Sequence, residues 1–246
     1  TMCEKVIDDK NFNINEKLIE FKKNYNGYMF SEDGKETVYN SDMILYYLNQ
    51  YNDLNKEPKN IISKNVRNDL GKIESIFNLG GFDDEKLQVL KDIVLEKPIL
   101  SSISDHFNLD IRFTINDFIS NLFYLGFLTI VGYDRTNRPL LATPNYVIKE
   151  LYFDFYNSII EKYTNFQISD SKLLNSLSPF AFDGDVKPFI SFVEEILSKL
   201  SNRDFIKFDE KNIKILMLTF LFRSELYLVK SEYEVEGGYI DIALFN

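Results

Sequence analysis

A chain of 246 residues is long enough for one large domain or two of ordinary size. Its 45% hydrophobic residues, with 22 Phe and 15 Tyr, can fill a buried core and exclude a disordered chain. The single cysteine excludes an intrachain disulfide framework and a multi-cysteine zinc site, and the formal net charge of −10 disfavours nucleic-acid binding unless a basic patch or a metal overrides it.

The start of the chain and its apolar runs bear on where the protein works. The opening TMCEKVIDDKNFNINEK is polar, and no run approaches the ~20 apolar residues of a membrane span. The longest apolar stretch, 213–222, is interrupted by Lys214 and Thr219 and is typical of a buried helix. We therefore expect a cytoplasmic chain with no membrane partner. The first residue, Thr1, is not an initiator Met, which indicates either a fragment of a longer protein or a residue left by cloning.

Residues 1–60 are expected to hold two helices joined by turns. Apolar residues at helical spacing predict a short amphipathic helix that ends near Asn24. Asn26-Gly27 is a turn signal, and Ser41 is the expected N-cap of the next helix. The polar stretch 52–60 is expected to be a linker or an exposed loop.

The middle of the chain, residues 56–164, is expected to be a helical, winged-helix-like region. Apolar residues at three- and four-residue spacing predict helices over 63–77, 83–97 and 114–125. Two apolar strands around the polar segment GYDRTNRP predict a β-hairpin, and a long helix follows Pro144. Helices followed by a hairpin wing are the reason for the winged-helix interpretation.

A winged helix raises the question of DNA binding. The helix that would enter the major groove, INDFISNLFYLG, contains no Lys or Arg, which major-groove readers normally need. Arg135 and Arg138 at the tip of the hairpin could touch phosphates, but arginines in such a turn are usually only solvated. We interpret the region as structural, or as built for protein contact.

Residues 165–246 are expected to be helices followed by a terminal hairpin over about 226–245. Asp170 and Asp209 are the expected N-caps of two of the helices. Helix 210–222 is apolar nearly all round, which makes it the natural cover for the hairpin.

The terminal hairpin carries the main candidate site. With Gly237 and Gly238 as the two loop residues, the expected cross-strand pairs are Glu236 with Tyr239, Glu234 with Asp241 and Glu232 with Ala243. One face would then be acidic, and the other would pack on the core through Tyr233, Val235, Ile240, Ile242 and Leu244. The acidic face suits a hard cation such as Mg²⁺, whereas a merely solvated face is the commoner cause of such a pattern. Both interpretations stay open at this point.

Other chemically active groups are isolated in the sequence. His106 is the only histidine and is expected at the surface or in a cap, because no partner for catalysis can be placed beside it. Cys3, near a terminus, is no better as a nucleophile. The sequence contains no G-x-x-x-x-G-K-[ST], and so no phosphate-binding loop of that type.

Two stretches carry a resemblance to a known family. The segment NYNGYMFSEDGKETVYNSDMILYYL contains Tyr-Asn-Gly-Tyr-x-Phe followed by Tyr-Asn, with Ser41 where the family has Pro. The terminal segment has Ser231-Glu232 and then Gly238-x-x-Asp241, with Tyr239 in place of the family's Arg. These motifs resemble a group of bacterial proteins that join an AAA-ATPase-like domain to a PD-(D/E)XK nuclease-like domain. NLFYLGFLTI and LLATPNYVIKELY are similar to its linking region.

The resemblance implies a fold that is mainly α with small β elements. It divides the chain into the C-terminal edge of the ATPase-like domain (1–55), the winged-helix-like region (56–164), and the helices and first hairpin of a truncated α/β PD-(D/E)XK-like end (165–246). It implies Asp241 as the first Mg²⁺ ligand, assisted by Glu210 from the preceding helix. Glu234 is a weaker candidate through its expected pairing with Asp241.

The same resemblance implies what a longer parent protein would do. It would couple ATP binding, in a part absent from this chain, to a metal-dependent nuclease-like domain acting on nucleic acid, in DNA processing or mobile-element defence. This chain alone would be inactive. The alternative is a non-enzymatic helical module whose acidic surface binds a protein partner or a second copy. A strand carrying Glu-x-Lys after Asn246 would favour the nuclease-like protein. A stop codon or a polar tail there would favour the protein-interaction module.

Overall fold

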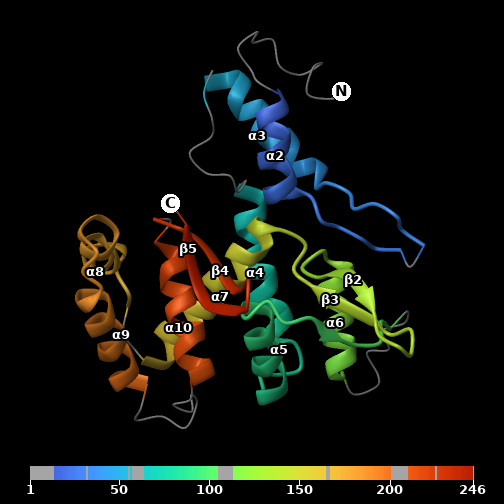
Figure 1. The fold of residues 1–246 in the computed structure, drawn as a ribbon. Coiled ribbons are helices and arrows are strands. Elements are labelled where there is room, and N and C mark those ends of the chain that lie inside the picture. The colour runs from blue at the N-terminus through green and yellow to red at the C-terminus, as the bar shows by residue number, and fades with distance from the viewer. Residues whose placement is uncertain are drawn as a thin grey trace. The chain divides into compact units, whose positions relative to one another are not determined.

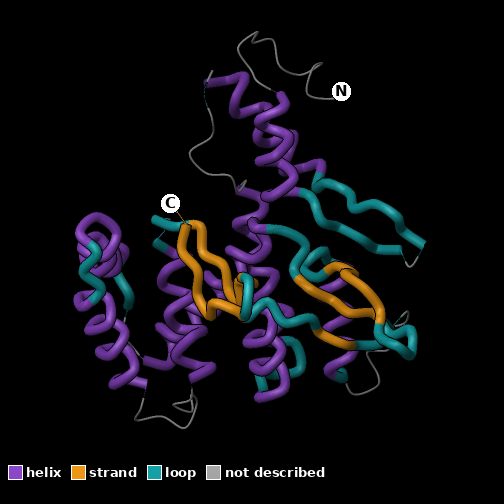
Figure 2. Tube along the Cα trace, viewed as in Figure 1, coloured by secondary structure: helices purple, strands orange, loops and turns teal. Residues whose placement is uncertain are grey.

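The structure is a computed structural model that describes residues 14–31, 33–54, 56, 64–104, 113–164, 167–200, 210–224 and 226–245. Cys3, His106 and Asp209 lie outside these residues. The described chain is mainly helical, with small antiparallel sheets, as expected from the sequence (Figures 1 and 2). It divides into two compact units, Thr1–Tyr152 and Phe153–Asn246, whose boundary falls within one helix.

The first unit begins with two helices that pack together, α2 (Ile14–Tyr25) and α3 (Ser41–Leu54) (Figure 1). Their contact is aromatic: the Phe21 and Tyr47 rings meet edge to face, with centroids 4.8 Å apart. The Asn40 side-chain oxygen accepts hydrogen bonds from the amides of Asp42 and Met43. Asn40, rather than the expected Ser41, therefore caps α3, because it stands one residue before the helical backbone begins.

The loop between α2 and α3 is held to the chain that follows it. Tyr28 and Val38 form an antiparallel bridge within the loop, and the Met29 carbonyl accepts a hydrogen bond from the Ile130 amide. Gly27 has a φ of +108°, and a Cβ built on it would lie 1.8 Å from the Pro144 carbonyl oxygen. Only glycine fits a backbone of this conformation at this distance. The turn signal Asn26-Gly27 thus marks a close approach between two distant segments.

The rest of the first unit consists of three helices and one sheet. The elements run α4 (Lys64–Asn78), α5 (Asp84–Val94), β1 (Ile99–Leu100), α6 (Ile115–Tyr124), β2 (Thr129–Tyr133) and β3 (Pro139–Ala142). The sheet has the order β1-β3-β2 and is antiparallel. The helices expected around 63–77 and 114–125 and the hairpin expected around GYDRTNRP are confirmed. The Phe77 and Phe118 rings, 4.8 Å apart, join α4 to α6 in the core.

A buried lysine closes the end of α4. Lys86, in the first turn of α5, is only 4% exposed, and its ammonium donates hydrogen bonds to the carbonyls of Phe77, Leu79 and Gly81. These carbonyls belong to the last turn of α4 and the loop after it, where backbone acceptors have no helical partner. The three donors of an ammonium match the three acceptors. Burial lowers the Lys86 pKa, and the nearby Asp83 carboxylate opposes that change.

The second unit contains the long helix that begins in the first, α7 (Tyr146–Thr164), and the elements after it. These are α8 (Asp170–Asp183), α9 (Lys187–Leu200), α10 (Glu210–Arg223), β4 (Leu228–Val235) and β5 (Gly238–Phe245). The Ser169 hydroxyl accepts a hydrogen bond from the Lys172 amide, so Ser169 caps α8 and the expectation for Asp170 was one residue too late. β4 and β5 form a two-stranded sheet that contacts α10.

Candidate cation site on the terminal hairpin

The register of the terminal hairpin differs from the expected one. Val235 pairs with Gly238, so the loop residues are Glu236 and Gly237 rather than the two glycines. A positive φ is needed at one loop position only, and Gly237 supplies it with φ +97°. The turn therefore starts one residue earlier, and Gly238 becomes the first residue of β5.

This shift changes every partner across the hairpin. Glu234 lies opposite Tyr239, not Asp241, and Ala243 lies opposite Lys230, not Glu232. Because Ser231 pairs with Ile242 and Tyr233 pairs with Ile240, the residues between these pairs, Glu232 and Asp241, are neighbours across the strands. The expected pair Glu234–Asp241 was wrong, and the pair that the structure forms is Glu232–Asp241.

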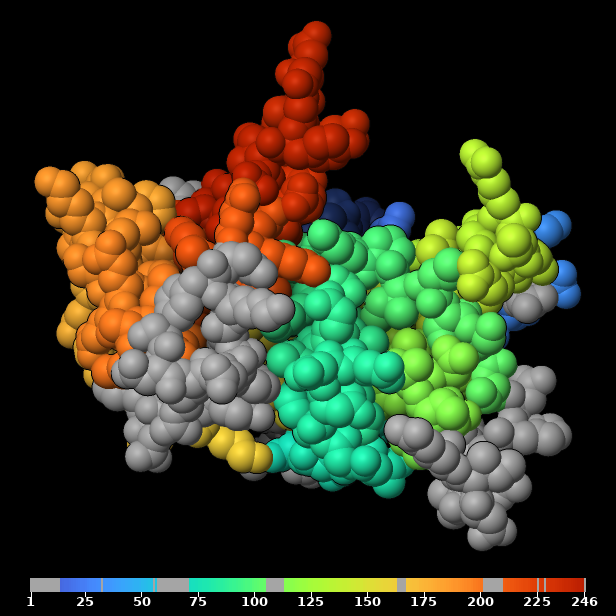
Figure 3. Space-filling view, turned by 90° about the horizontal axis from the view of Figure 1, so that it is seen from below, coloured from blue at the N-terminus to red at the C-terminus, as the bar shows by residue number. Residues whose placement is uncertain are grey.

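The face expected to pack on the core is not buried along its length. Val229, which pairs with Leu244, is buried at the base, whereas Val235 and Ile240 are exposed. The buried Ala243 lies on the opposite face, with Asp241. Figure 3 shows the hairpin, in red, protruding from the surface of its unit. Helix α10 contacts the hairpin, and its Lys214 reaches Glu232 and Asp241. The helix therefore faces the side of the hairpin that carries the carboxylates, which leaves Val235 and Ile240 on the other side exposed.

A lysine from α10 lies between the two carboxylates. The Lys214 ammonium donates a hydrogen bond to Asp241 over 2.9 Å and a second to the Glu232 carboxylate. The Lys214 side chain is 11% exposed, whereas that of Asp241 is 73% exposed. The ammonium is thus the inner member of the cluster, with the carboxylates on its solvent side. Sequence reasoning missed this residue, because Lys214 only appeared to interrupt an apolar run.

The electrostatics of the cluster favour a positive charge. Partial burial alone would lower the pKa of the Lys214 ammonium, but its hydrogen bonds to Glu232 and Asp241 raise that pKa above the ordinary value on balance. Glu232 has a positive φ of 51°, an uncommon backbone conformation for a residue with a side chain. The residue that supplies the second carboxylate is thus the point at which the backbone of β4 departs from the extended conformation.

The other expected ligands take different positions. Glu210 is exposed in the first turn of α10, four residues before Lys214 and so on the same side of the helix. Glu234 is exposed and lies two residues beyond Glu232 toward the turn. Among the described residues, no group of three or more His, Cys, Asp or Glu side chains is placed to hold a metal ion. Asp241 and Glu232 form only a pair, and that pair already has an ammonium.

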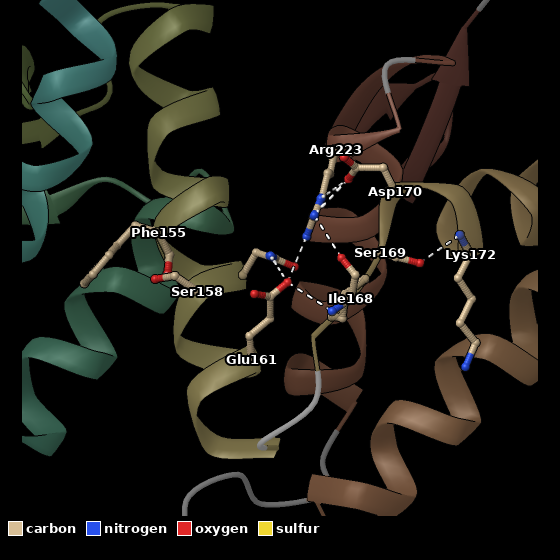
Figure 4. Close-up of polar contacts among 9 residues, drawn as sticks. Phe155, Ser158, Glu161, Ile168, Ser169, Asp170, Lys172 and Arg223 are labelled. Carbon is tan, nitrogen blue, oxygen red and sulfur yellow. Dashed lines mark hydrogen bonds and ion pairs between the residues drawn. The ribbon is translucent and has the colours of Figure 1, made fainter.

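The opposite end of α10 is fixed by an arginine (Figure 4). The Arg223 guanidinium donates hydrogen bonds to the Asp170 carboxylate at 2.8 Å and 3.0 Å, to the Ile168 carbonyl at 3.0 Å and to Glu161 at 3.3 Å. Glu161 also accepts from the Ile168 amide and from Asn157. These bonds join α10 to α7 and to the start of α8, so the helix that presents Lys214 is held at its C-terminal end.

The two wing arginines can be placed as well. Asp134 accepts hydrogen bonds from the amides of Thr136 and Arg138, from the Thr136 hydroxyl and from the Arg138 guanidinium. The Arg138 amide first, and then the Thr136 hydroxyl, lower the Asp134 pKa to about 2. Arg138 is thus neutralised within its own turn, while Arg135 is exposed beside it.

Comparison with known proteins adds no identification. No protein family, no curated protein and no solved structure matches the chain. Among the described residues, no helix has both the length and the apolar character needed to cross a membrane.

Proposed function

We propose that α10 and the β4–β5 hairpin are the opening of a PD-(D/E)XK nuclease-like domain, in which Asp241 is the first ligand of a divalent cation. The longer protein would then be an ATPase with a metal-dependent nuclease-like domain, in DNA processing or mobile-element defence. ATP would bind outside this chain, and the chain alone would not cleave nucleic acid. The proposal rests on the resemblance of the Ser231–Asp241 segment and on the geometry around Asp241.

The observation that carries the proposal is the contact between Asp241 and a cationic group of α10. A helix followed by a hairpin, with an acidic residue of the second strand facing the helix, is the arrangement that the resemblance implies. The ion pairs of the Lys214 ammonium with Glu232 and Asp241 support a site that favours positive charge. Glu210 begins the same helix, in the first turn on the same side.

The residues present fit a divalent cation in part. Asp241 and Glu232 supply carboxylate oxygens, which Mg²⁺ prefers, but Mg²⁺ takes six oxygen ligands and would need water, substrate phosphate or Glu210 for the rest. Bound there, Mg²⁺ would supply Lewis-acid stabilisation of charge on a phosphodiester. Asp241 would hold it, Glu232 would complete the pair of carboxylates, and Lys214 would keep the two carboxylates together in its absence.

The proposal is tested by titrating the chain with Mn²⁺, used as a spectroscopic substitute for Mg²⁺, and counting free ions by electron paramagnetic resonance. We expect weak binding, with a dissociation constant of about 10⁻³ M, the weak end of the range for oxygen-ligand sites. Asp241→Asn should weaken it at least about tenfold. The matched control is Asp185→Asn, an exposed carboxylate in the loop between α8 and α9. Equal affinity of both variants and the unaltered chain would remove Asp241 from the site.

A second candidate function, a protein-interaction module, is favoured by the chemistry of the middle region. The order of α5, β1, α6, β2 and β3, with the sheet order β1-β3-β2, supports the winged-helix interpretation. Its recognition-type helix α6 carries Asp117 and no basic residue, and Arg138 at the wing is paired with Asp134. Both features disfavour binding to the phosphate backbone of DNA, so a protein is the preferred partner.

This second candidate is tested by a fluorescence-anisotropy titration with labelled duplex DNA at physiological salt. We expect no binding below micromolar DNA concentrations, because the net charge of −10 repels phosphate and Arg138 at the wing is already paired with Asp134. Sub-micromolar binding that Arg135→Ala abolishes would show that the wing contacts DNA.

A further inference from the structure

A hollow with a mixed polar and apolar lining lies in the first unit. It measures about 310 Å³ and is formed where the loop between α2 and α3, the start of α3 and the end of α6 meet. Five large side chains around it are between 38% and 56% exposed. They are Phe30, Val38, Tyr39, Tyr124 and Leu125. An exposed apolar patch gathered around a hollow is typical of an interaction site rather than of an ordinary surface.

The walls of this hollow are fixed in place. Tyr28 and Val38 exchange two backbone hydrogen bonds, of 3.2 Å and 2.9 Å, and the Thr129 hydroxyl donates to the Met29 carbonyl at 3.1 Å. Phe30 is supported by the rings of Tyr28 and Phe123, with centroids 5.8 Å and 5.5 Å away. A preformed hollow avoids the entropic cost of ordering a loop when a ligand binds.

The charges beside the hollow are mostly negative. The described loop and the first turn of α3 present three exposed carboxylates, Asp33, Glu36 and Asp42, against one exposed ammonium, Lys35. Lys149, which follows the lining residue Ile148, is paired with Glu96. Glu36 lies two residues before the lining residue Val38, and Asp42 directly follows the lining residue Ser41. Negative charge close to the hollow attracts a basic residue, while the exposed apolar side chains around the hollow suit an apolar one.

We propose that this hollow, with its acidic edge, binds an extended peptide segment of a partner protein, in which a large apolar residue is flanked by Arg or Lys. The apolar residue enters the hollow, and the basic residues lie against Asp33, Glu36 and Asp42. An arginine in the peptide would gain further affinity through cation–π contact with the exposed aromatic rings. A second copy of this chain is disfavoured as the occupant, because both copies would bring the same acidic edge and a net charge of −10.

The proposal deepens the interaction module described above and rests on it, but it is independent of the cation site on the hairpin. It is tested with a phage library of random twelve-residue peptides, selected on the intact chain and counter-selected on Leu125→Ser. Selected peptides are then synthesised with a fluorescent label and titrated by anisotropy. We expect enriched sequences to combine Leu, Phe or Ile with neighbouring Arg or Lys.

Substitutions at exposed positions separate the hollow from other surfaces. Leu125→Ser and Val38→Ser should each weaken the selected peptide at least about tenfold, and Glu36→Gln by about threefold. The matched control is Leu54→Ser, an exposed leucine at the end of α3 outside the hollow, which should leave the affinity unchanged. Circular dichroism of each variant establishes that it is folded.

Each contrary outcome has a distinct meaning. Peptides whose binding is unaffected by Leu125→Ser and Val38→Ser would overturn the hollow as the site while leaving the interaction module intact. No enrichment of any peptide would overturn both. An acidic consensus would contradict the predicted partner chemistry. Concentration-dependent dimerisation in light scattering, abolished by Leu125→Ser, would replace the peptide with a second copy.

Discussion

Two lysines of this chain differ in the groups that their ammonium groups bind. Lys86 is buried and gives all three ammonium protons to backbone carbonyls, so it completes the end of a helix. Lys214 is partly buried and faces two carboxylates at the solvent boundary, so it marks a site for positive charge. The sequence places both lysines at the edge of apolar runs. Only the positions of the acceptors distinguish a lysine that satisfies backbone carbonyls from one that pairs with surface carboxylates.

Replacing Lys86 should destabilise the first unit strongly. Lys86→Met leaves three backbone carbonyls without their donor, and hydrogen bonds to charged groups contribute about 1.5–3 kcal/mol. We expect a loss of about 2–3 kcal/mol in the free energy of unfolding, measured by urea denaturation. Lys97→Met, at an exposed lysine just after α5, is the control and should change the stability by less than about 0.5 kcal/mol. Equal effects of the two substitutions would contradict the assigned role.

Asp134 should titrate far below an ordinary aspartate. Hydrogen bonds from the Arg138 amide and the Thr136 hydroxyl set its pKa at about 2. Because the folded pKa lies below the unfolded one, the turn is stabilised above pH ~4 and loses that contribution as the pH falls through about 2. Carboxyl carbon shifts in an NMR pH titration measure this directly. A midpoint near pH 4 would mean that the turn is open in solution.

Helices and strands follow from periodicity more reliably than their ends and partners do. Apolar residues at three- and four-residue spacing predict the helix over 64–78, and two apolar runs flanking a polar turn predict the hairpin around residues 129–142; the structure contains both. The caps at Asn40 and Ser169 and the hairpin turn at Glu236-Gly237 differ from expectation by one residue. Neighbouring Asn, Ser, Asp and Gly residues compete for such positions, and tertiary contacts decide between them.

The candidate site shows the cost of a one-residue error. Asp241 could be selected from the sequence because a carboxylate interrupts an apolar strand, and the structure places it beside a cationic group. Its partner Glu232 could not be assigned, because moving the turn by one residue changes every cross-strand pair. The contact of Lys214 with these carboxylates could not be predicted from the sequence either, because it depends on how α10 packs against the hairpin.

Two glycines give a matched test of the loop that joins α2 to α3. Gly27→Ala should cost at least about 3 kcal/mol, because the added carbon would meet the Pro144 carbonyl oxygen in a backbone conformation that disfavours side chains. Gly71→Ala, in α4 where the added carbon meets nothing, should instead stabilise the chain by about 0.5–1 kcal/mol. Thermal and urea unfolding measure both. A neutral Gly27→Ala would mean that the loop does not pack against Pro144.

For the whole molecule, the composition says more about which partners the chain can bind than about how the chain folds. A net charge of −10 and the isolated basic residues at the wing disfavour a nucleic-acid partner for the chain itself. The two compact units carry different features, a hollow in the first and a charged cluster in the second. We therefore propose partner binding for the first unit and cation binding for the second.

The chain should not bind nucleotide. The sequence has no glycine-rich loop followed by Lys and Ser or Thr, and the Tyr25–Phe30 segment is proposed only as the edge of an ATPase-like domain. Isothermal titration with Mg-ATP should give no heat of binding at micromolar to millimolar nucleotide. Saturable binding in the micromolar range would require a phosphate site of a kind that the sequence does not reveal.

Paramagnetic broadening in NMR spectra tests whether Asp241 belongs to a cation site that faces α10. Sub-stoichiometric Mn²⁺ broadens the amide signals of residues nearest to the bound ion. The account predicts that the signals of Asp241, Glu232 and the first turn of α10 disappear first and that Asp241→Asn restores them. Broadening that begins elsewhere on the acidic surface, or that persists in Asp241→Asn, would contradict the cation site and leave Asp241 as the partner of Lys214 alone.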